Sequence, residues 1–263
     1  MSRKSRQYGF SLTETLMAVG TLAIGLTFIA GTFLTGIYFS TFSTERSIAA
    51  VAAEEAFAKM QIFSRDPDGA DIEADEHIDY NDIAKLAARE WRYPSVAGDI
   101  GKQYSWAAIC RRIVPDSNLV QSTVFVSREA GGKLSYWKRD GNAADAPLEV
   151  SDRPRPVRIQ VDRDSSADEN EIRIQDDASS ANVDERTFVS EGSILVDDAT
   201  GDLYRVLERV ADRPGAVKLD RDWEGGDLTD GSGGRVWVVP PAASGGRNPG
   251  VAVYQKVLTF PGR

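Results

Sequence analysis

An apolar stretch at residues 10–42 constrains this chain more than any other feature of its sequence. Glu14 is the only charged side chain within it. About 20 apolar residues span a bilayer, so the stretch is long enough to cross a membrane and to continue as helix beyond it. Arg3, Lys4 and Arg6 precede it, with no acidic residue among them. Because positive charges are retained on the cytoplasmic side, the sequence predicts a cytoplasmic N-terminus and a single span.

The carboxylate of Glu14 needs a partner. At the centre of a bilayer it would cost about 2.5–3.5 kcal/mol. The next cation along the chain is Arg46, roughly nine helical turns away at 3.6 residues per turn, so it cannot supply the charge. The sequence therefore predicts that the neutralising group comes from another molecule.

The octapeptide Gly9-Phe10-Ser11-Leu12-Thr13-Glu14-Thr15-Leu16 resembles the N-terminus of type IV pilins and type II secretion pseudopilins. The resemblance extends to about residue 55 of 263. It implies that a prepilin peptidase cleaves after Gly9 and methylates the new N-terminal Phe10. It also implies that Glu14 pairs with the N-terminal amine of a neighbouring subunit. The implied partners are the peptidase and other pilin or pseudopilin subunits. The implied location is the inner (cytoplasmic) membrane, and a periplasmic or extracellular filament after assembly.

The apolar stretch has two other possible interpretations, a secretory signal peptide and an uncleaved membrane anchor. A secretory signal peptide has an apolar core of about 7–15 residues before a small-residue cleavage site. The stretch here is longer, contains Glu14, and reaches an Ala-x-Ala pattern only at residues 50–52. An uncleaved single-span anchor that carries an extracytoplasmic β-rich binding domain has the same hydropathy, but it gives no reason for Glu14 or for Gly9-Phe10. At the level of sequence this second interpretation stays open.

The pattern after the apolar stretch predicts that the helix continues. Apolar residues recur at helical spacing from Ile48 onward, no Gly or Pro occurs between residue 43 and Pro67, and residues 66–69 have the composition of a turn. One helix from Leu12 to Phe63 is therefore expected, with an amphipathic second half that lies on a head domain. Small residues at intervals of four in the first half predict a contact seam with other helices: Ala23, Thr27, Gly31 and Thr35.

The rest of the chain predicts an antiparallel β head. A short helix is expected at residues 82–91, and a hairpin is expected from strands at 104–114 and 119–128. Further strands are expected at 133–138, 157–161, 171–175, 193–196, 203–210, 217–219, 235–239 and 251–260, the last of which would close the sheet. The expected fold class is α+β and pilin-like: a long N-terminal transmembrane helix packed on an antiparallel sheet, with an additional β-rich segment either inserted in the head or appended to it.

The expected division of the chain has five parts. These are a cytoplasmic leader at 1–9, the long helix at 10–66 with its transmembrane half at 10–42, a head region at 67–138, an acidic loop-rich region at 139–186 and a C-terminal β-rich region at 187–263. A head of this size suits a minor pilin, a minor pseudopilin or a tip subunit better than the main repeating unit of a filament.

Charge and residue usage exclude several function classes. The formal net charge is -9 and no Lys/Arg cluster occurs outside the leader, so nucleic-acid binding is not expected. Cys110 is the only cysteine, which rules out an intrachain disulfide and is expected to be buried in mid-strand. His77 is the only histidine and is expected in a solvated acidic loop. No phosphate loop, Cys/His metal spacing or nucleophile elbow is recognisable, so the chain is not expected to be an enzyme.

One acidic run bears on metal binding. Asp162, Asp164 and Asp168 alternate as at the start of an EF-hand loop, but Ala167 stands where the loop needs glycine and Arg173 where it needs a closing glutamate. No cofactor is therefore expected, and calcium at the three aspartates is kept as the one alternative.

Overall fold

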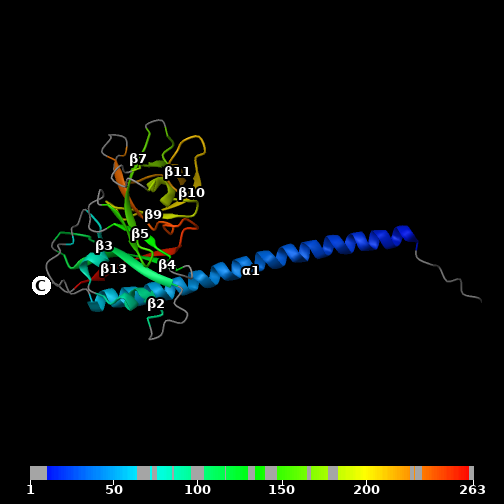
Figure 1. Ribbon diagram of the computed structural model, residues 1–263, viewed down its shortest axis with the longest axis horizontal. Coiled ribbons are helices and arrows are strands. Elements are labelled where there is room, and N and C mark those ends of the chain that lie inside the picture. The colour runs from blue at the N-terminus through cyan, green and yellow to red at the C-terminus, as the bar shows by residue number, and fades with distance from the viewer. Residues whose placement is uncertain are drawn as a thin grey trace, which may run out of the picture. The chain divides into compact units, whose positions relative to one another are not determined.

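The structure is a computed structural model. It describes residues 11–63, 72, 76–84, 86–95, 104–115, 117–129, 134–139, 147–164, 167–176, 183–225, 228 and 233–260. The chain divides into two compact units, Met1–Ser47 and Ile48–Arg263. The fold is α+β, with one long N-terminal helix and antiparallel sheets (Figure 1).

The helix α1 spans Leu12–Phe63, which confirms the expected bounds. Among the described residues it is the one helix long and apolar enough to cross a membrane. Its large apolar side chains between Leu12 and Phe42 are exposed. Its second half buries one face, made chiefly of alanines with Phe57 and Met60, and alanine lets the helix backbone approach a sheet closely. The buried alanines are Ala49, Ala52, Ala53 and Ala56.

A five-stranded antiparallel sheet receives this face of the helix. The expected hairpin is confirmed as β3 (Tyr104–Arg112) and β4 (Leu119–Arg128), and β13 (Gly250–Thr259) pairs with β4 along its whole length as the expected closing strand. The short strands β1 (Ile78–Asp79) and β2 (Arg92–Tyr93) both pair with β3.

Strand β3 is buried on both of its faces. Cys110 belongs to the core shared with α1, whereas its neighbour Ile109 belongs to a second cluster with Val196 and Trp237 of the barrel described below. Because successive side chains of a strand point to opposite faces, the sheet lies between the second half of α1 and the barrel. The near-continuous burial of β3 follows from this arrangement.

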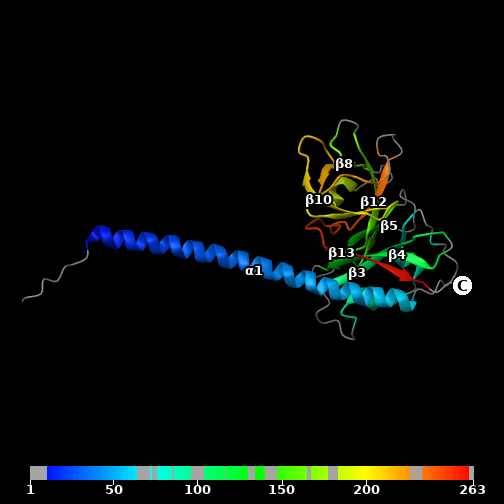
Figure 2. The same ribbon diagram turned by 180° about the vertical axis from the view of Figure 1, so that it is seen from behind.

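The remaining long strands form a closed antiparallel barrel, which was not expected from the sequence. Figures 1 and 2 together label its members, and their order around the barrel is β10-β11-β8-β7-β12-β9. Their inward side chains alternate with outward ones and form one apolar core, as in β7, where Val157, Ile159 and Val161 are fully buried. The strand bounds are β7 (Val157–Asp162), β8 (Glu171–Ile174), β9 (Ile194–Asp197), β10 (Leu203–Arg209), β11 (Ala216–Leu219) and β12 (Gly234–Val238).

The barrel is an insertion in the head, because β13 returns to the sheet after it. Its strands come from both sides of the boundary expected at residues 186–187. A separate two-stranded sheet, β5 (Tyr136–Arg139) with β6 (Leu148–Ser151), precedes it along the chain. Strand β6 was not predicted from the sequence. Between residues 139 and 186, strands were expected only at 157–161 and 171–175.

The prediction of a short helix at residues 82–91 is wrong. Two shorter elements occur: α2 (Tyr80–Ile83), capped by the side chain of Asp79, and the 3-10 helix η1 (Ala88–Trp91). Tyr80 and Trp91 are buried and contact each other edge-on, so packing of these rings against the core replaces a continuous helix. A second 3-10 helix, η2 (Glu185–Phe188), precedes β9.

We expect Gly215→Ala to destabilise the barrel. Gly215 has φ +81°, which L side chains rarely adopt, and an added Cβ would lie 2.7 Å from the backbone oxygen of Ile174. The combined strain is expected to lower the free energy of unfolding by about 2–3 kcal/mol. Gly192 is the matched control, because its φ is +83° but no atom lies within 4 Å of the added Cβ.

Urea unfolding of the full chain in detergent micelles measures both variants, with tryptophan fluorescence as the signal. Gly192→Ala should cost only about 1 kcal/mol, the backbone contribution alone. Equal losses for the two variants would show that the close approach at Ile174 does not constrain residue 215.

Candidate functional site

The N-terminus of α1 holds the Glu14 side chain in its first turn. The backbone N–H of Glu14 donates to the hydroxyl oxygen of Ser11 at 3.2 Å, and the N–H of Thr15 donates to the carbonyl oxygen of Ser11 at 3.1 Å. Ser11 is thus the N-cap, and Ser11-x-x-Glu14 has the spacing of a capping box. Glu14 also has an ordinary local role in the structure, since an acidic residue in the first turn stabilises the positive end of the helix dipole.

The carboxylate of Glu14 is exposed, and no residue in the described ranges donates a hydrogen bond to it. Nor does any cation in those ranges form an ion pair with it. In an aqueous setting water would satisfy such a group. In a membrane it would require a donor from outside the described residues.

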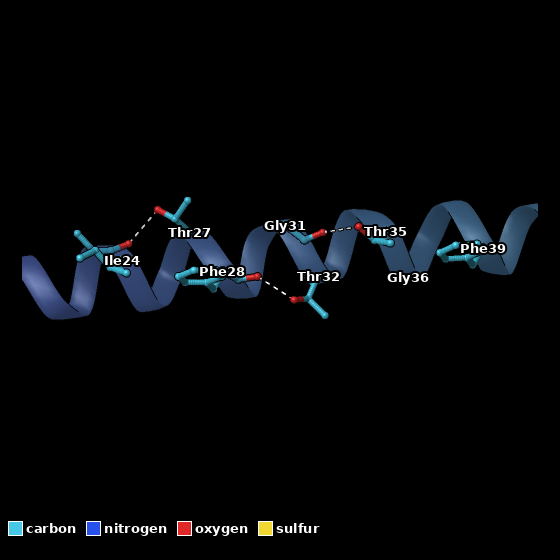
Figure 3. Close-up of a pocket in the computed structure, with 9 residues that line it drawn as sticks. Ile24, Thr27, Phe28, Gly31, Thr32, Thr35, Gly36 and Phe39 are labelled. Carbon is cyan, nitrogen blue, oxygen red and sulfur yellow. Dashed lines mark hydrogen bonds between the residues drawn. The ribbon is translucent and has the colours of Figure 1, made fainter.

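Several threonine hydroxyl groups in the apolar half of α1 are satisfied within the helix itself. The hydroxyls of Thr27 and Thr35 donate to the carbonyl oxygens of Ala23 and Gly31, each at 2.9 Å, and Figure 3 shows the bonds of this kind along the helix. Thr32 does the same toward Phe28 at 2.9 Å. A threonine bonded in this way presents its methyl group outward, so the segment remains compatible with lipid.

These residues lie on one open face of the helix. Figure 3 shows that face, which is shaped by small residues between larger apolar ones. Among the expected seam residues, Gly31 has open space around its Cα, so another helix could approach closely there. The face comprises Ala23, Ile24, Thr27, Phe28, Gly31, Thr32, Thr35, Gly36 and Phe39.

The other two residues of the expected processing site, Gly9 and Phe10, lie outside the described residues. Their roles as cleavage position and methylated N-terminus therefore stay predictions. Of the three residues, the structure places Glu14.

Two of the aspartates considered as calcium ligands, Asp162 and Asp168, contact other side chains. The side chain of Asp162 accepts hydrogen bonds from Arg173 Nε at 2.9 Å and from Gln175 Nε2 at 2.6 Å. Partial burial alone would raise the pKa of Asp162, but these hydrogen bonds outweigh it and the pKa is lowered. Asp168 has an exposed carboxylate at 4.0 Å from Lys218 Nζ. Within the described parts of the chain no three His, Cys, Asp or Glu side chains are grouped to hold a metal ion, and calcium at Asp162, Asp164 and Asp168 stays an untested alternative.

Cys110 is buried in the middle of β3, as expected. Burial raises the pKa of its thiol to about 12, so the reactive thiolate is suppressed at neutral pH. Its sulfur lies 3.7 Å from the hydroxyl of Ser122, which is an ordinary packing contact for a small apolar side chain.

His77 is the main correction to the sequence analysis. It was expected in a solvated loop, but its side chain is fully buried against the turn between β9 and β10. The acidic residues around it in the sequence gave no indication of this, because the groups around the ring lie far later in the chain, at Arg111, Arg158 and Asp198.

Comparison of the chain with protein-family models, with curated proteins and with solved structures gave no significant match. Its functional interpretation therefore depends on the residues themselves.

Proposed function

We propose that the chain is a structural subunit of a type IV pilus or a type II secretion pseudopilus. In this proposal a prepilin peptidase cleaves after Gly9, Phe10 becomes the methylated N-terminus, and α1 buries its apolar half against sibling helices. The observation that carries the proposal is the state of Glu14. The hydroxyls of Thr27, Thr32 and Thr35 in the apolar half have partners within the helix, whereas the Glu14 carboxylate has none among the described residues.

An N-terminal amine from a neighbouring subunit would meet this requirement. A carboxylate and an ammonium group attract strongly where water is excluded, and this attraction offsets part of the desolvation penalty of both. An axial stagger between adjacent helices would bring the amine at Phe10 of one subunit to Glu14 of the next. The open face around Gly31 allows the close helix contacts that such a bundle needs.

The head supports a role as a minor or tip subunit. Its sheet is covered on one face by the second half of α1 and on the other by the barrel. The barrel has its own apolar core and contributes no strand to the sheet. We propose that it faces outward and contacts other subunits, cargo or surfaces, with the chain first held in the inner membrane. No enzymatic or nucleic-acid-binding role is proposed.

A second candidate is a membrane-anchored extracytoplasmic binding domain that does not polymerise. The closed barrel favours it, because a self-contained β unit presented on an anchored sheet would serve as a binding module. The same helix would then be only an anchor, and Glu14 only a member of the Ser11 capping box.

The state of the mature N-terminus distinguishes the two candidates. Intact-mass and N-terminal peptide mass spectrometry of protein from a host with a prepilin peptidase should show a chain that starts at methylated Phe10. Replacement Gly9→Val should leave most of the protein uncleaved, and Gly20→Val, within the helix, is the matched control that should still be processed. A wild-type chain that keeps Met1 or Ser2 would favour the anchored binding domain.

A further inference from the structure

The sheet and the barrel meet at a joint with an apolar part and a polar part. The apolar part contains Ile109 and Phe125 from the sheet and Val196, Trp237 and Val239 from the barrel side, all buried. These side chains alone would hold the two layers together by burial. The polar part lies beside them and is built around His77.

His77 precedes β1 and is 0% exposed. Its Nδ1 lies 2.6 Å from the backbone carbonyl oxygen of Asp198, and its own backbone N–H donates to Asp198 Oδ1 at 3.3 Å. The carboxylate of Asp198 also accepts hydrogen bonds from Trp237 Nε1 at 2.6 Å and from Arg158 Nη1 at 3.0 Å. The β9–β10 turn therefore binds His77 through both its backbone and its carboxylate.

The contact at Nδ1 fixes the tautomer of the ring. A carbonyl oxygen can only accept a hydrogen bond, so the neutral imidazole carries its proton on Nδ1 and a lone pair on Nε2. Nε2 is buried, and no described residue lies within hydrogen-bonding distance of it. A proton added at Nε2 would create both a buried charge and a second N–H without an acceptor, and each is costly.

Charged groups of both signs face the ring. From the barrel come Arg158 of β7 and the carboxylates of Asp197 and Asp198. From the sheet comes Arg111 of β3, whose guanidinium donates to the carbonyl oxygens of Ala199 and, at 2.6 Å, Thr200.

On the segment of His77 itself, the two nearest carboxylates among the described residues are already paired. Glu76 forms ion pairs with Arg158 and, at 3.7 Å, with Arg235. Asp79 pairs with Arg155 at 2.7 Å. The described anions around the ring are therefore largely matched by arginines, so these groups leave little net negative charge to stabilise an imidazolium.

We propose that this joint is a proton-sensitive lock, in which the barrel stays docked on the sheet only while His77 is neutral. Protonation places an unmatched N–H and a cation inside the joint, and separation of the β9–β10 turn from His77 lets water reach the ring. The apolar part of the joint limits the separation, so the response is a local opening and the cores of the sheet and barrel stay folded.

The sign of the pH dependence follows from burial. Desolvation is the largest effect on the ring and lowers the pKa of His77 from 6.5 to about 4, against a smaller opposing effect of the Asp198 hydrogen bond. The open joint therefore binds more protons than the closed one between pH 6.5 and 4, and closure is lost as pH falls through this range. The ratio of open to closed joint is expected to rise about 20-fold from pH 7 to pH 5, and about 240-fold from pH 7 to full protonation.

Hydrogen exchange of the full chain in detergent micelles tests the lock. Mass spectrometry follows the peptide that contains residues 76–80, with each rate divided by the intrinsic rate at its pH. The protection factor of this peptide should fall about 20-fold between pH 7 and pH 5, while peptides within β4 and β7 keep theirs. A protection factor at residues 76–80 that does not change with pH would overturn the proposal. An equal fall in the protection factors of this peptide and of the β4 and β7 peptides would overturn it too.

Substitution His77→Asn removes the titration but keeps a side-chain N–H that can donate to the carbonyl of Asp198. Its protection factor at residues 76–80 should be independent of pH over the same range. Asp162→Asn is the matched control, since it removes a carboxylate with a lowered pKa from the barrel without contacting His77, and it should keep the wild-type profile. An unchanged fall in His77→Asn would overturn the proposal.

A direct titration does not depend on any variant. Because His77 is the only histidine, selective 13C labelling of histidine gives a single imidazole signal in the wild-type chain. Its midpoint should lie well below 6.5 and coincide with the loss of protection at residues 76–80. A midpoint near 6.5 in a protein that keeps full protection would show that the ring is accessible to protons without opening, and would refute the lock. None of these readouts depends on filament assembly.

Discussion

Replacement of Glu14 by glutamine is expected to remove the chain from filaments while leaving it folded in the membrane. The proposal requires a charge at residue 14 that pairs with the N-terminal amine of an adjacent subunit. Without it the amine would enter the apolar core of the filament uncompensated, at a cost of about 3–5 kcal/mol. Incorporation should therefore fall by at least about tenfold, since about 1.4 kcal/mol already corresponds to that factor.

Glutamine is the informative substitution because it separates two roles of Glu14. The first turn of α1 has the capping-box spacing Ser11-x-x-Glu14, and glutamine serves in that motif as glutamate does. A purely local capping role predicts that Glu14→Gln behaves as the wild type, whereas intersubunit charge pairing predicts loss of assembly.

The assay compares shed filaments with the membrane fraction by quantitative immunoblotting. Glu45→Gln is the matched control, because it removes a carboxylate from the same helix beyond the apolar stretch and should assemble normally. Normal membrane levels of Glu14→Gln exclude a defect in insertion or folding. Wild-type incorporation of Glu14→Gln would refute the subunit proposal.

The parts of the fold that depend on local pattern were predictable from the sequence. The helix α1 follows from an apolar stretch that continues into helical periodicity without Gly or Pro, and its bounds agree with the expected ones. The β3–β4 hairpin follows from two β-rich segments around residues 115–118. The barrel strands were each expected within about three residues of their bounds, because alternation of apolar residues marks a strand whatever its partners are.

The barrel closure and the burial of His77 depend on contacts that no local pattern encodes. Strand β7 pairs with β12, and β9 also pairs with β12, across long stretches of intervening chain, whereas the β9–β10 pair is a local hairpin. His77 is buried only because the turn after β9 closes over it. At the candidate site, the charge and position of Glu14 were evident from the sequence, but the internal bonding of the threonines that sets it apart required the structure.

Loss of the buried ion pair between Arg139 and Glu185 is expected to be the most destabilising single change in the head. The two side chains are 3% and 0% exposed, and an Arg139 Nη2–Glu185 Oε1 contact joins β5 to η2. Arg139 Nη1 also donates to the carbonyl oxygen of Arg158 in β7 at 2.6 Å, which links both elements to the barrel. Replacement Glu185→Gln removes the negative charge that Glu185 places against the buried guanidinium and should lower the free energy of unfolding by about 3–5 kcal/mol.

A double variant separates the contribution of the ion pair from the cost of burying a charge that has lost Glu185. Arg139→Met with Glu185→Leu replaces both charged groups by apolar side chains, and such replacements are often neutral, so the double variant should recover most of the stability lost by Glu185→Gln. The control is Arg173→Met at the ion pair with Asp162, where Arg173 is 51% exposed and solvent screens the interaction. Its expected cost is below about 1 kcal/mol. Urea unfolding in micelles measures the free energy of unfolding of each variant. A loss of stability in Glu185→Gln no larger than in Arg173→Met would show that water reaches the Arg139 guanidinium in the native head.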